Sequence, residues 1–429
     1  MAEIIPYHSG LDVVVLNGGG GSVLVGGLAQ AMPEAMITSI VPTGDSGSKT
    51  GELREVFGGP AIGDARKTLG TIASEAVRPL FSDDEGRFGE DATFKTVEAL
   101  NRRFLDIMEA QGLDTETPAK SPDDSTPAKI LDDIIEHIKE LPAGERSLPG
   151  HTYMNLVLNA IRLRKNNLLT PALEEMHTWV GAPKNVRILP ITEESHNVIL
   201  YDKVARRLRI GEGEADEYSP VDPSQVTVWL EAGKMENRKV DDPAEAEAYY
   251  ASRHERRAPH ANPRALASVA LSDMTVLAPG SWYTTHEAIL KNRGVTDAFN
   301  VQRSLGGLWV VVANLVAEKT GMDLHTHLSG VQAASGRAAT HLIHNTDIDS
   351  LPQSSVPLIF DPESFNADDA VAIGEALVDS HQAESSSKDP IAHLRSPGHH
   401  NAWHIADLVR TKIVPDTGLA AKKSAPVGV

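Results

Sequence analysis

The sequence contains no cysteine, and aromatic side chains make up only 5% of its 429 residues. The absence of cysteine excludes disulfide bonds, thiol nucleophiles and metal sites with thiolate ligands. No run approaches the ~20 consecutive apolar residues that a membrane-spanning helix needs. The first ten residues also lack the basic segment followed by an apolar segment that is typical of a signal peptide. We therefore expect a cytoplasmic protein that has no membrane partner.

Positive charge is scarce, because 40 Lys and Arg residues stand against 59 Asp and Glu residues, which gives a net charge of −19. Nucleic acids and anionic membrane surfaces are bound through clustered Lys and Arg side chains. The charge balance therefore argues against both as partners. It does not exclude a small molecule that carries phosphate, because backbone amides, an arginine or a cation can reverse the field locally.

The stretch that organises the chain is LDVVVLNGGGGSVLVGGL, which begins at Leu11. Its apolar residues 13–16 predict a buried parallel strand, and residues 22–31 predict a helix. The glycines between them let the backbone approach a ligand closely and direct amide N–H groups and a helix N-terminus at an anion. The residues that we expect to bind phosphate here are Gly18, Gly19, Gly20, Gly21 and Ser22.

Two further polar loops follow within the next fifty residues. Residues 37–41 predict a second strand that leads into PTGDSGSKTG, and IGDARKTL follows at 62–69. Loops that follow parallel strands meet at one edge of a sheet. The three loops together therefore indicate a single site at the carboxyl ends of parallel strands.

The run of four glycines differs from the GxGxxG pattern of dinucleotide-binding proteins, and no acidic residue for a ribose ends the second strand. A cradle for a nucleoside diphosphate or a sugar phosphate is therefore favoured over one for NAD. For this loop taken alone, a tight turn without a ligand is the alternative interpretation.

The rest of the chain alternates between helical and strand patterns. We divide it into an N-terminal part of an α/β core (1–77), a helical insertion or cap (78–148), the remainder of the core (149–415) and a flexible tail (416–429). The expected fold is a three-layer Rossmann-like α/β core with a mainly parallel sheet. The further strands that we expect lie at 186–192, 226–233, 274–279, 307–316, 339–345 and 356–360, with a hairpin over 198–213.

The loops resemble those of the CofD-like superfamily, which contains 2-phospho-L-lactate transferases and YvcK-type gluconeogenesis or morphogenesis factors. LNGGGGSVLVGGL, IVPTGDSGSKTGELREVFGGPAIGDARKTL, PGHTYMNL and LAPGSWYTT follow the order of the superfamily's motifs. The YvcK-type pattern is the more similar, with GGGTG, a DDGGSSGRLR-like loop, PPGDIRNCL, GHSFGNL and GPGSLYTSI. The resemblance covers about 1–70 and 149–320.

The chain departs from that pattern at three places. Gly44 and Asp45 stand where the family usually has paired acids, so one acid is missing from the second loop. Met154 replaces the second glycine of GHSFGNL, and residues 193–260 differ from the family in length and charge. A divergent branch with an altered ligand is therefore expected.

The resemblance implies that Asp45 and Asp64 lie at the reacting end of the site, where they bind Mg²⁺ or accept a proton from an attacking hydroxyl. Mg²⁺ takes oxygen ligands and neutralises diphosphate charge, so two carboxylates beside a phosphate cradle make chemical sense. The alternative for Asp64 is an N-cap of the helix that follows it. Arg66 is expected to pair with phosphate or with Asp64.

Further candidate ligand contacts come from later motifs. His151 and Asn155 are four residues apart, which places both on one helix face, where they would bind a ribose, base or sugar hydroxyl or form a buried polar pair. Hydroxyls and amides also lie at the predicted helix start after Pro279, which suits phosphate unless this is an ordinary turn. The remaining candidates, which match family positions, are Thr192, Gly280, Ser281, Tyr283, Thr284 and Asn314.

Two functions remain open. The first is a nucleotide- or nucleotide-sugar-binding regulator of carbon or cell-envelope metabolism, similar to the YvcK-type factors. The second is a Mg²⁺-dependent enzyme similar to 2-phospho-L-lactate transferase, which moves a phospholactyl-type group from a nucleoside diphosphate carrier to an acceptor hydroxyl. The single acid at Asp45 favours the binding protein. No organic cofactor is expected, and the family resemblance allows a homodimer.

Overall fold

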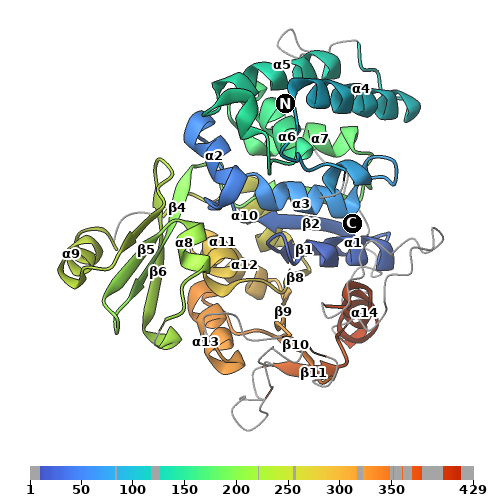
Figure 1. Cartoon of the computed structure of the whole chain (residues 1–429). Coiled ribbons are helices and arrows are strands. Elements are labelled where there is room, and N and C mark those ends of the chain that lie inside the picture. Colours follow the sequence, from blue (N-terminus) through green and yellow to red (C-terminus); the bar gives the residue numbers. More distant parts are fainter. Residues whose placement is uncertain are drawn as a thin grey trace.

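A seven-stranded parallel sheet forms the centre of the molecule (Figure 1). The computed structural model describes residues 10–82, 85–116, 126–220, 222–254, 258–315, 322–347, 351, 360, 370–378 and 400–416. The sheet has the strand order β11-β10-β9-β8-β1-β2-β3, and all neighbouring strands are parallel. Its strands are β1 (Asp12–Leu16), β2 (Met36–Val41), β3 (Val186–Pro190), β8 (Met274–Leu277), β9 (Leu308–Val312), β10 (His341–Asn345) and β11 (Val371–Glu375).

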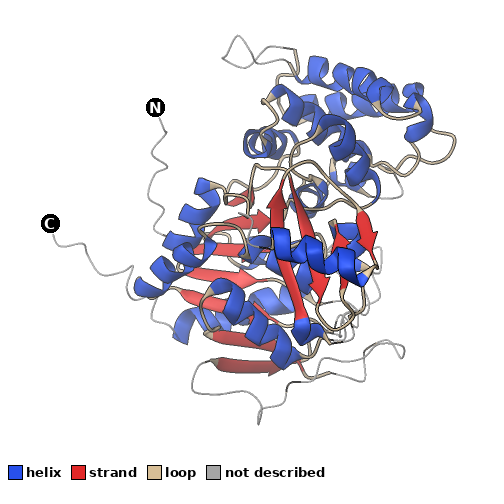
Figure 2. Cartoon of the chain, turned by 90° about the vertical axis from the view of Figure 1, so that its left-hand side faces the viewer, coloured by secondary structure: helices blue, strands red, loops and turns tan. Residues whose placement is uncertain are grey.

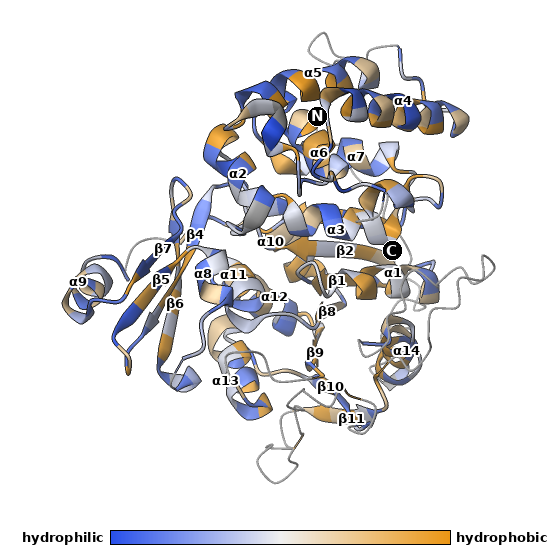
Figure 3. Cartoon of the chain, in the orientation of Figure 1, coloured by the Kyte–Doolittle hydropathy of each residue, from blue (hydrophilic) through white to orange (hydrophobic). Residues whose placement is uncertain are grey.

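Helices cover both faces of this sheet, as Figure 2 shows. The side chains of β1 alternate between the two faces, since Val13 and Val15 belong to one hydrophobic cluster and Val14 and Leu16 to the other. A central parallel strand is buried on both sides, which explains its unbroken apolar run. Figure 3 shows apolar residues concentrated on β1 and β2 at the centre of the molecule. The expected Rossmann-like α/β core is therefore confirmed.

Most of the expected strands are present, but one was missed. The segments predicted at 186–192, 274–279, 307–316 and 339–345 contain β3, β8, β9 and β10. The edge strand β11 was not predicted, because its burial alternates weakly and Val371 is 56% exposed. The strand expected at 356–360 lies outside the described residues, apart from Phe360.

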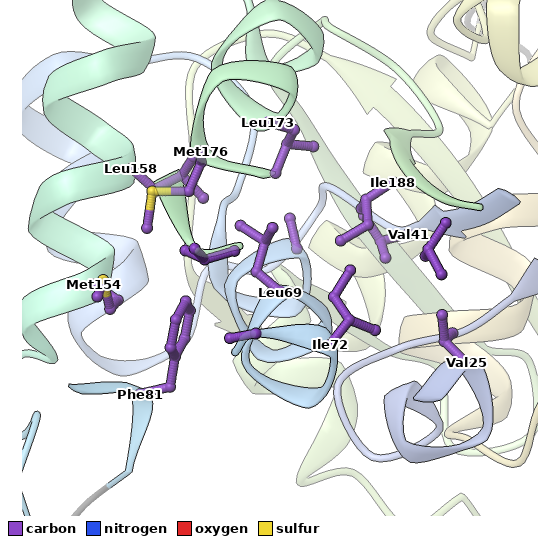
Figure 4. Close-up of a cluster of buried hydrophobic side chains, with 14 of the residues drawn as sticks. Val25, Val41, Leu69, Ile72, Phe81, Met154, Leu158, Leu173, Met176 and Ile188 are labelled. Atoms are coloured by element: carbon purple, nitrogen blue, oxygen red, sulfur yellow. The ribbon is translucent and has the colours of Figure 1, made fainter. Parts of the chain in front are cut away.

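Four helices form a cap beyond α3 (Figure 1). Figure 4 shows how apolar side chains join this cap to the sheet, with Leu69 from α3, Met154 from α6 and Met176 from α7 in one cluster with Ile188 of β3. Within the cap, the Tyr153 hydroxyl donates to Asn101 Oδ1 at 3.0 Å. The bounds are α4 (Phe94–Ala110), α5 (Pro127–Glu140), α6 (Tyr153–Arg164) and α7 (Leu169–Trp179).

A second sheet of four antiparallel strands extends from the core on the side opposite α14 (Figure 1). Its order is β6-β4-β5-β7, and β4 is buried throughout. Val198 and Leu200 of β4 pack with the main core, whereas Ile199 and Tyr201 pack under α9. The hairpin expected over 198–213 is present as β4 and β5. The bounds are β4 (His196–Asp202), β5 (Arg207–Ile210), α8 (Glu212–Asp216), β6 (Val226–Ala232), β7 (Arg238–Val240) and α9 (Pro243–Arg253).

The remaining helices complete the two covering layers. In the described part of the chain, none of the helices is both long and apolar enough to cross a membrane. Their bounds are α1 (Ser22–Ala31), α2 (Ser48–Phe57), α3 (Gly63–Ile72), α10 (Pro263–Leu271), α11 (Glu287–Leu290), α12 (Val295–Ser304), α13 (Leu324–Ser335) and α14 (Ala402–Leu408), with a π-helical turn at Trp282–His286 before α11.

Candidate functional site

The candidate site lies where the strand order of the main sheet reverses. From β1 the chain proceeds outward through β2 to β3, and it later returns to β8, which pairs with the other edge of β1. The loops after β1 and β8 therefore lie side by side at the carboxyl ends of their strands. In doubly wound sheets this switch point is where ligands bind. Both loops had been selected from the sequence as phosphate-binding segments.

The glycines of the first loop allow this close packing. A Cβ atom on Gly18 would lie 2.6 Å from Thr285 Oγ1, and one on Gly21 would lie 2.6 Å from the Pro279 carbonyl oxygen. A Cβ atom on Gly20 would meet no atom within 4 Å, so Gly20 faces open space. Ser22 is buried, and its hydroxyl donates to the Gly19 carbonyl at 2.6 Å. Ser22 therefore stabilises the conformation of the loop by an internal hydrogen bond.

We expect Gly21→Ala to destabilise the protein by about 2 kcal/mol, because the added methyl group clashes with backbone in a packed region. The Gly20→Ala variant is the matched control, with an expected change within about 0.5 kcal/mol, as for other surface substitutions. Urea denaturation of the two variants and the wild type measures both changes. Equal effects at the two positions would contradict the packing of the two loops.

The loop after β8, at residues 279–285, is fixed by Asn314 and His286. The Gly280 N–H donates to Asn314 Oδ1 at 2.9 Å, and Asn314 Nδ2 donates back to the Gly280 carbonyl at 3.0 Å. His286 Nε2 donates to the Ala278 carbonyl at 2.9 Å. Ser281 caps the π-helical turn with its side chain, and Tyr283 is buried inside it. Asn314 lies just after β9 rather than within it, and its role is to hold Gly280.

Asp64 connects the start of α3 to the first glycine loop. It lies in the first turn of α3, and its Oδ1 accepts a hydrogen bond from the Gly19 N–H at 2.8 Å. The N-cap residue of α3 is Ile62, so the N-cap interpretation of Asp64 is wrong. Burial, followed by the negative charge of Asp45, raises the pKa of Asp64 to about 6. Lys67 and the Gly19 hydrogen bond oppose that rise.

Asp45 shares its position with a carboxylate that the sequence did not suggest. Asp45 Oδ1 accepts the Gly47 N–H at 2.7 Å, and the Asp45 side chain is also hydrogen-bonded to Glu212 of α8. Burial and the adjacent Asp45 raise the pKa of Glu212 to about 9. Glu212 is therefore protonated at neutral pH. The loop at Asp45 lacks the second acid of the family pattern, and in the folded chain Glu212 lies beside Asp45 in its place.

Asp216, the last residue of α8, contacts the loop after β8. Its Oδ1 accepts the Thr284 hydroxyl at 3.5 Å. Its negative charge contributes to the raised pKa of Glu212, as does that of Asp64. The carboxyl groups of Asp45, Asp64, Glu212 and Asp216 thus gather around the edge of the glycine loops. The sequence had placed the start of α8 in the hairpin predicted over 198–213 and had selected neither Glu212 nor Asp216.

Arg54 holds the backbone of the Asp45 loop from behind. Its guanidinium donates to the carbonyl oxygens of Gly44 at 3.0 Å and Asp45 at 2.6 Å, and to the His196 carbonyl at 2.7 Å. It also bonds to Ser195 Oγ and the Gly59 carbonyl. Arg54 is 3% exposed. This one side chain joins the second loop to the start of β4.

The remaining polar candidates lie on the side of the cap. Arg66 Nε donates to Asn155 Oδ1 at 3.2 Å, and His151 Nε2 lies 3.2 Å from Glu52 Oε2 on α2. Burial lowers the pKa of His151 to about 4, so its imidazole is neutral and donates to Glu52. The expectation that His151 and Asn155 share a helix face is wrong, because α6 begins at Tyr153. Asn155 contacts α3 instead, and His151 contacts α2.

Thr192 is placed apart from the acids. Its hydroxyl accepts the Glu194 N–H at 3.1 Å, and its carbonyl accepts the Thr43 hydroxyl. It lines a cavity of about 590 Å³, together with Glu193, His260, Arg293 and other residues from the starts of α10 and α12. None of the four site carboxylates lines this cavity. Thr192 therefore orders the strand end rather than joining the acid cluster.

Comparison with known families identifies the chain. The family model of 2-phospho-L-lactate transferase CofD matches residues 13–378. The chain belongs to the CofD family. No curated protein matches it significantly.

Two crystal structures of protein BH3568 from Bacillus halodurans share the fold of this CofD-family chain, and one of them is described as a member of the UPF0052 family. Each is 18% identical, with TM-scores of 0.61 and 0.60. They cover 94% and 93% of this chain and 99% of their own chains. The similarity thus extends over the whole fold, including the insertion after α3.

The acids of this CofD-family chain suit a cation that is held partly by its ligand. In the described residues, no group of three or more His, Asp or Glu side chains is arranged to hold a metal ion by itself. Mg²⁺ commonly uses one or two carboxylates and completes its shell with phosphate oxygens and water. The Asp45 side chain is hydrogen-bonded to Glu212, so oxygen donors from two segments of the chain meet at this point. The oxygen donors fit such a shared site.

A buried pair of histidines beneath the loop after β8 makes the stability of the fold depend on pH. His286 Nδ1 lies 3.0 Å from His327 Nε2, and the two rings are stacked. His286 Nε2 donates to Ala278, so in a neutral His286 ring Nδ1 is the acceptor and His327 Nε2 is the donor. Burial lowers the pKa of His286 to about 4 and that of His327 to about 3.

We expect His286→Gln to destabilise the protein at pH 7 but by a smaller amount at pH 5. The unfolded chain takes up a proton on this histidine below about pH 6.5, whereas the folded chain resists it until about pH 4, so the wild type loses stability across that interval. The loss should reach roughly 3 kcal/mol by pH 4. Urea denaturation from pH 7 to pH 5 measures the difference. A gap between variant and wild type that stays constant would show that His286 is not held neutral.

Proposed function

We propose that this chain binds a nucleoside diphosphate derivative, with a nucleotide sugar as the leading candidate, and acts as a regulator of carbon or cell-envelope metabolism. The observation that carries the proposal is the packing of the Gly18–Gly21 loop against the loop at Pro279–Thr285 at the switch point, with Gly20 open to ligand. Both loops precede helices, so their amides favour phosphate oxygens. Membership of the CofD family supports a phosphate-containing ligand.

The acid cluster defines how such a ligand must be bound. The carboxylates of Asp45 and Asp64 would repel a diphosphate that approached the glycine loop without a counter-ion. We therefore propose that Mg²⁺ binds together with the ligand, with Asp45 and Asp64 as its protein ligands. The cation supplies neutralisation of phosphate charge when bound. The residues of the two glycine loops orient the phosphates.

Transfer chemistry is the second candidate, and Glu212 favours it. Its carboxyl lies beside Asp45 and replaces the acid that the loop lacks, so one carboxylate can orient an acceptor while another accepts its proton. In that reaction the acceptor hydroxyl oxygen bonds to the phosphorus that carries the lactyl-type group. The bond from that phosphorus to the bridging oxygen breaks, a nucleoside monophosphate leaves, and the hydroxyl proton passes to a carboxylate.

A thermal-shift titration distinguishes these functions. UDP-N-acetylglucosamine, UDP-glucose, GDP, GTP and NAD are each added with and without Mg²⁺. A ligand at a hundred times its dissociation constant adds about 2.7 kcal/mol of stability. A Mg²⁺-dependent shift with a UDP-sugar supports the regulator, and one confined to guanine nucleotides supports the transferase. A shift with NAD alone contradicts both.

The matched variants are Asp64→Asn and Asp106→Asn. Asp106 is an exposed residue on α4 of the cap. The ligand-induced shift should disappear in Asp64→Asn and persist in Asp106→Asn. Equal shifts in the two variants would remove Asp64 from the proposed site.

A further inference from the structure

Lys67 lies across the glycine loop, although no motif had drawn attention to it. It is three residues after Asp64 on α3, which places both side chains on the same face of the helix. A Cβ atom on Gly19 would lie 2.8 Å from Lys67 Nζ and 2.8 Å from Asp64 Oδ1, so both groups adjoin the same backbone atom. The next residue, Gly20, faces open space. The ammonium group is therefore at the open side of the loop.

The other cationic side chains around the site already have hydrogen-bond or ion-pair partners within the protein. Arg54 donates to buried carbonyl oxygens, and Arg66 donates to Asn155 and to the Phe81 carbonyl. Lys49 pairs with Glu52 at 2.6 Å. Lys67, in contrast, makes no hydrogen bond, and no ion pair within 4 Å, with any residue in the part of the chain that the structure describes. It remains near enough to Asp64 to lower the pKa of that carboxyl.

We propose that Lys67 is a ligand-binding residue whose ammonium group contacts one phosphate of the diphosphate, while the cation at Asp45 and Asp64 contacts the other. The inference rests on the proposed function and adds a residue that binds one of the two phosphates. Lysine binds phosphate as a flexible point charge with three donors, and an exposed, unpaired side chain needs no rearrangement to do so. Lys67 lies on the Gly19 side of Asp64, whereas Asp45 lies against Gly63 at the start of α3. Lys67 and Asp45 thus adjoin Asp64 at different backbone positions, which suits a ligand with two phosphates.

The test compares Lys67→Met and Lys67→Arg with the wild type and with Lys95→Met, a matched exposed lysine on α4. Isothermal titration calorimetry gives the dissociation constants of UDP and UMP, and of GDP and GMP, in the presence of Mg²⁺. We expect Lys67→Met to weaken diphosphate binding at least 10-fold and to reduce the preference for diphosphate over monophosphate. Lys67→Arg should stay within about 3-fold of the wild type, because the positive charge is retained.

The outcomes distinguish a failure of the proposed function from a failure of the role of Lys67. Wild-type protein that binds neither diphosphate contradicts the proposed function and this role of Lys67 with it. Wild-type protein that prefers a diphosphate, together with a Lys67→Met variant that has the same affinity and the same preference, contradicts only the role of Lys67. Equal losses in Lys67→Met and Lys95→Met would assign the effect to net charge and also overturn the proposal.

Discussion

Arg54→Met should lower the free energy of unfolding by roughly 3–5 kcal/mol, the range for removing one partner of a buried charged network. Methionine fills much of the space but donates no hydrogen bond. The carbonyl oxygens of Gly44, Asp45 and His196 would then be buried without a donor. Each such group costs about 1–3 kcal/mol when it is left unsatisfied, less what water recovers. Urea denaturation at pH 7.5 measures the loss.

Two further variants control this result. Arg102→Met removes an exposed arginine from α4 and should change stability by less than about 0.5 kcal/mol. Arg54→Lys keeps the positive charge, but its single ammonium group cannot donate to all five acceptors of the forked guanidinium. It should therefore recover only part of the lost stability. If Arg54→Met cost no more than Arg102→Met, the guanidinium would not hold the Asp45 loop.

Asp64→Asn should stabilise the ligand-free protein by roughly 2 kcal/mol at pH 8, while it abolishes Mg²⁺-dependent ligand binding. The folded pKa of about 6 exceeds the ordinary value of 3.8, so the folded chain holds this proton more tightly than the unfolded chain. Its contribution to stability is fully present below about pH 3.8 and is lost as the pH rises through 6. Asparagine removes the charge and still accepts the Gly19 N–H.

The pH dependence makes this prediction specific. The stability gain of Asp64→Asn over the wild type should be present at pH 8 and nearly absent at pH 4, where the wild-type carboxyl is already protonated. Glu212→Gln should behave in the same direction, since burial and Asp45 raise its pKa to about 9. Thermal unfolding at the two pH values provides the measurement. If Asp64→Asn were less stable than the wild type at pH 8, the charged Asp64 carboxylate would not destabilise the folded protein.

The sequence predicted the parts of the site that depend on local pattern. The apolar run at 13–16 and the glycines after it indicated a central strand and a phosphate loop, because a strand buried on both faces has no polar side. The loop at Pro279–Thr284 was found for the same reason, since it follows the apolar strand β8. Parallel strands bring such loops together, so their packing also followed from the pattern.

The rest depended on contacts between distant segments. Glu212 joins Asp45 only because the antiparallel sheet places α8 against the second loop, and the sequence had predicted only a hairpin over 198–213. His151 has the spacing of a helix face with Asn155, but Pro149 and Gly150 delay the helix until Tyr153. Lys67 lies on the expected helix, yet only the three-dimensional structure places its ammonium at Gly19.

The most direct test of the account is the dissociation constant of a nucleoside diphosphate or UDP-sugar for the wild-type protein, measured by isothermal titration calorimetry at pH 7.5 with Mg²⁺ and then with EDTA. In the proposed function, the carboxylates of Asp45 and Asp64 repel a diphosphate unless a cation binds with it. The account therefore predicts that Mg²⁺ tightens binding at least 10-fold. Binding that is equally tight in EDTA, or no binding under either condition, would contradict it.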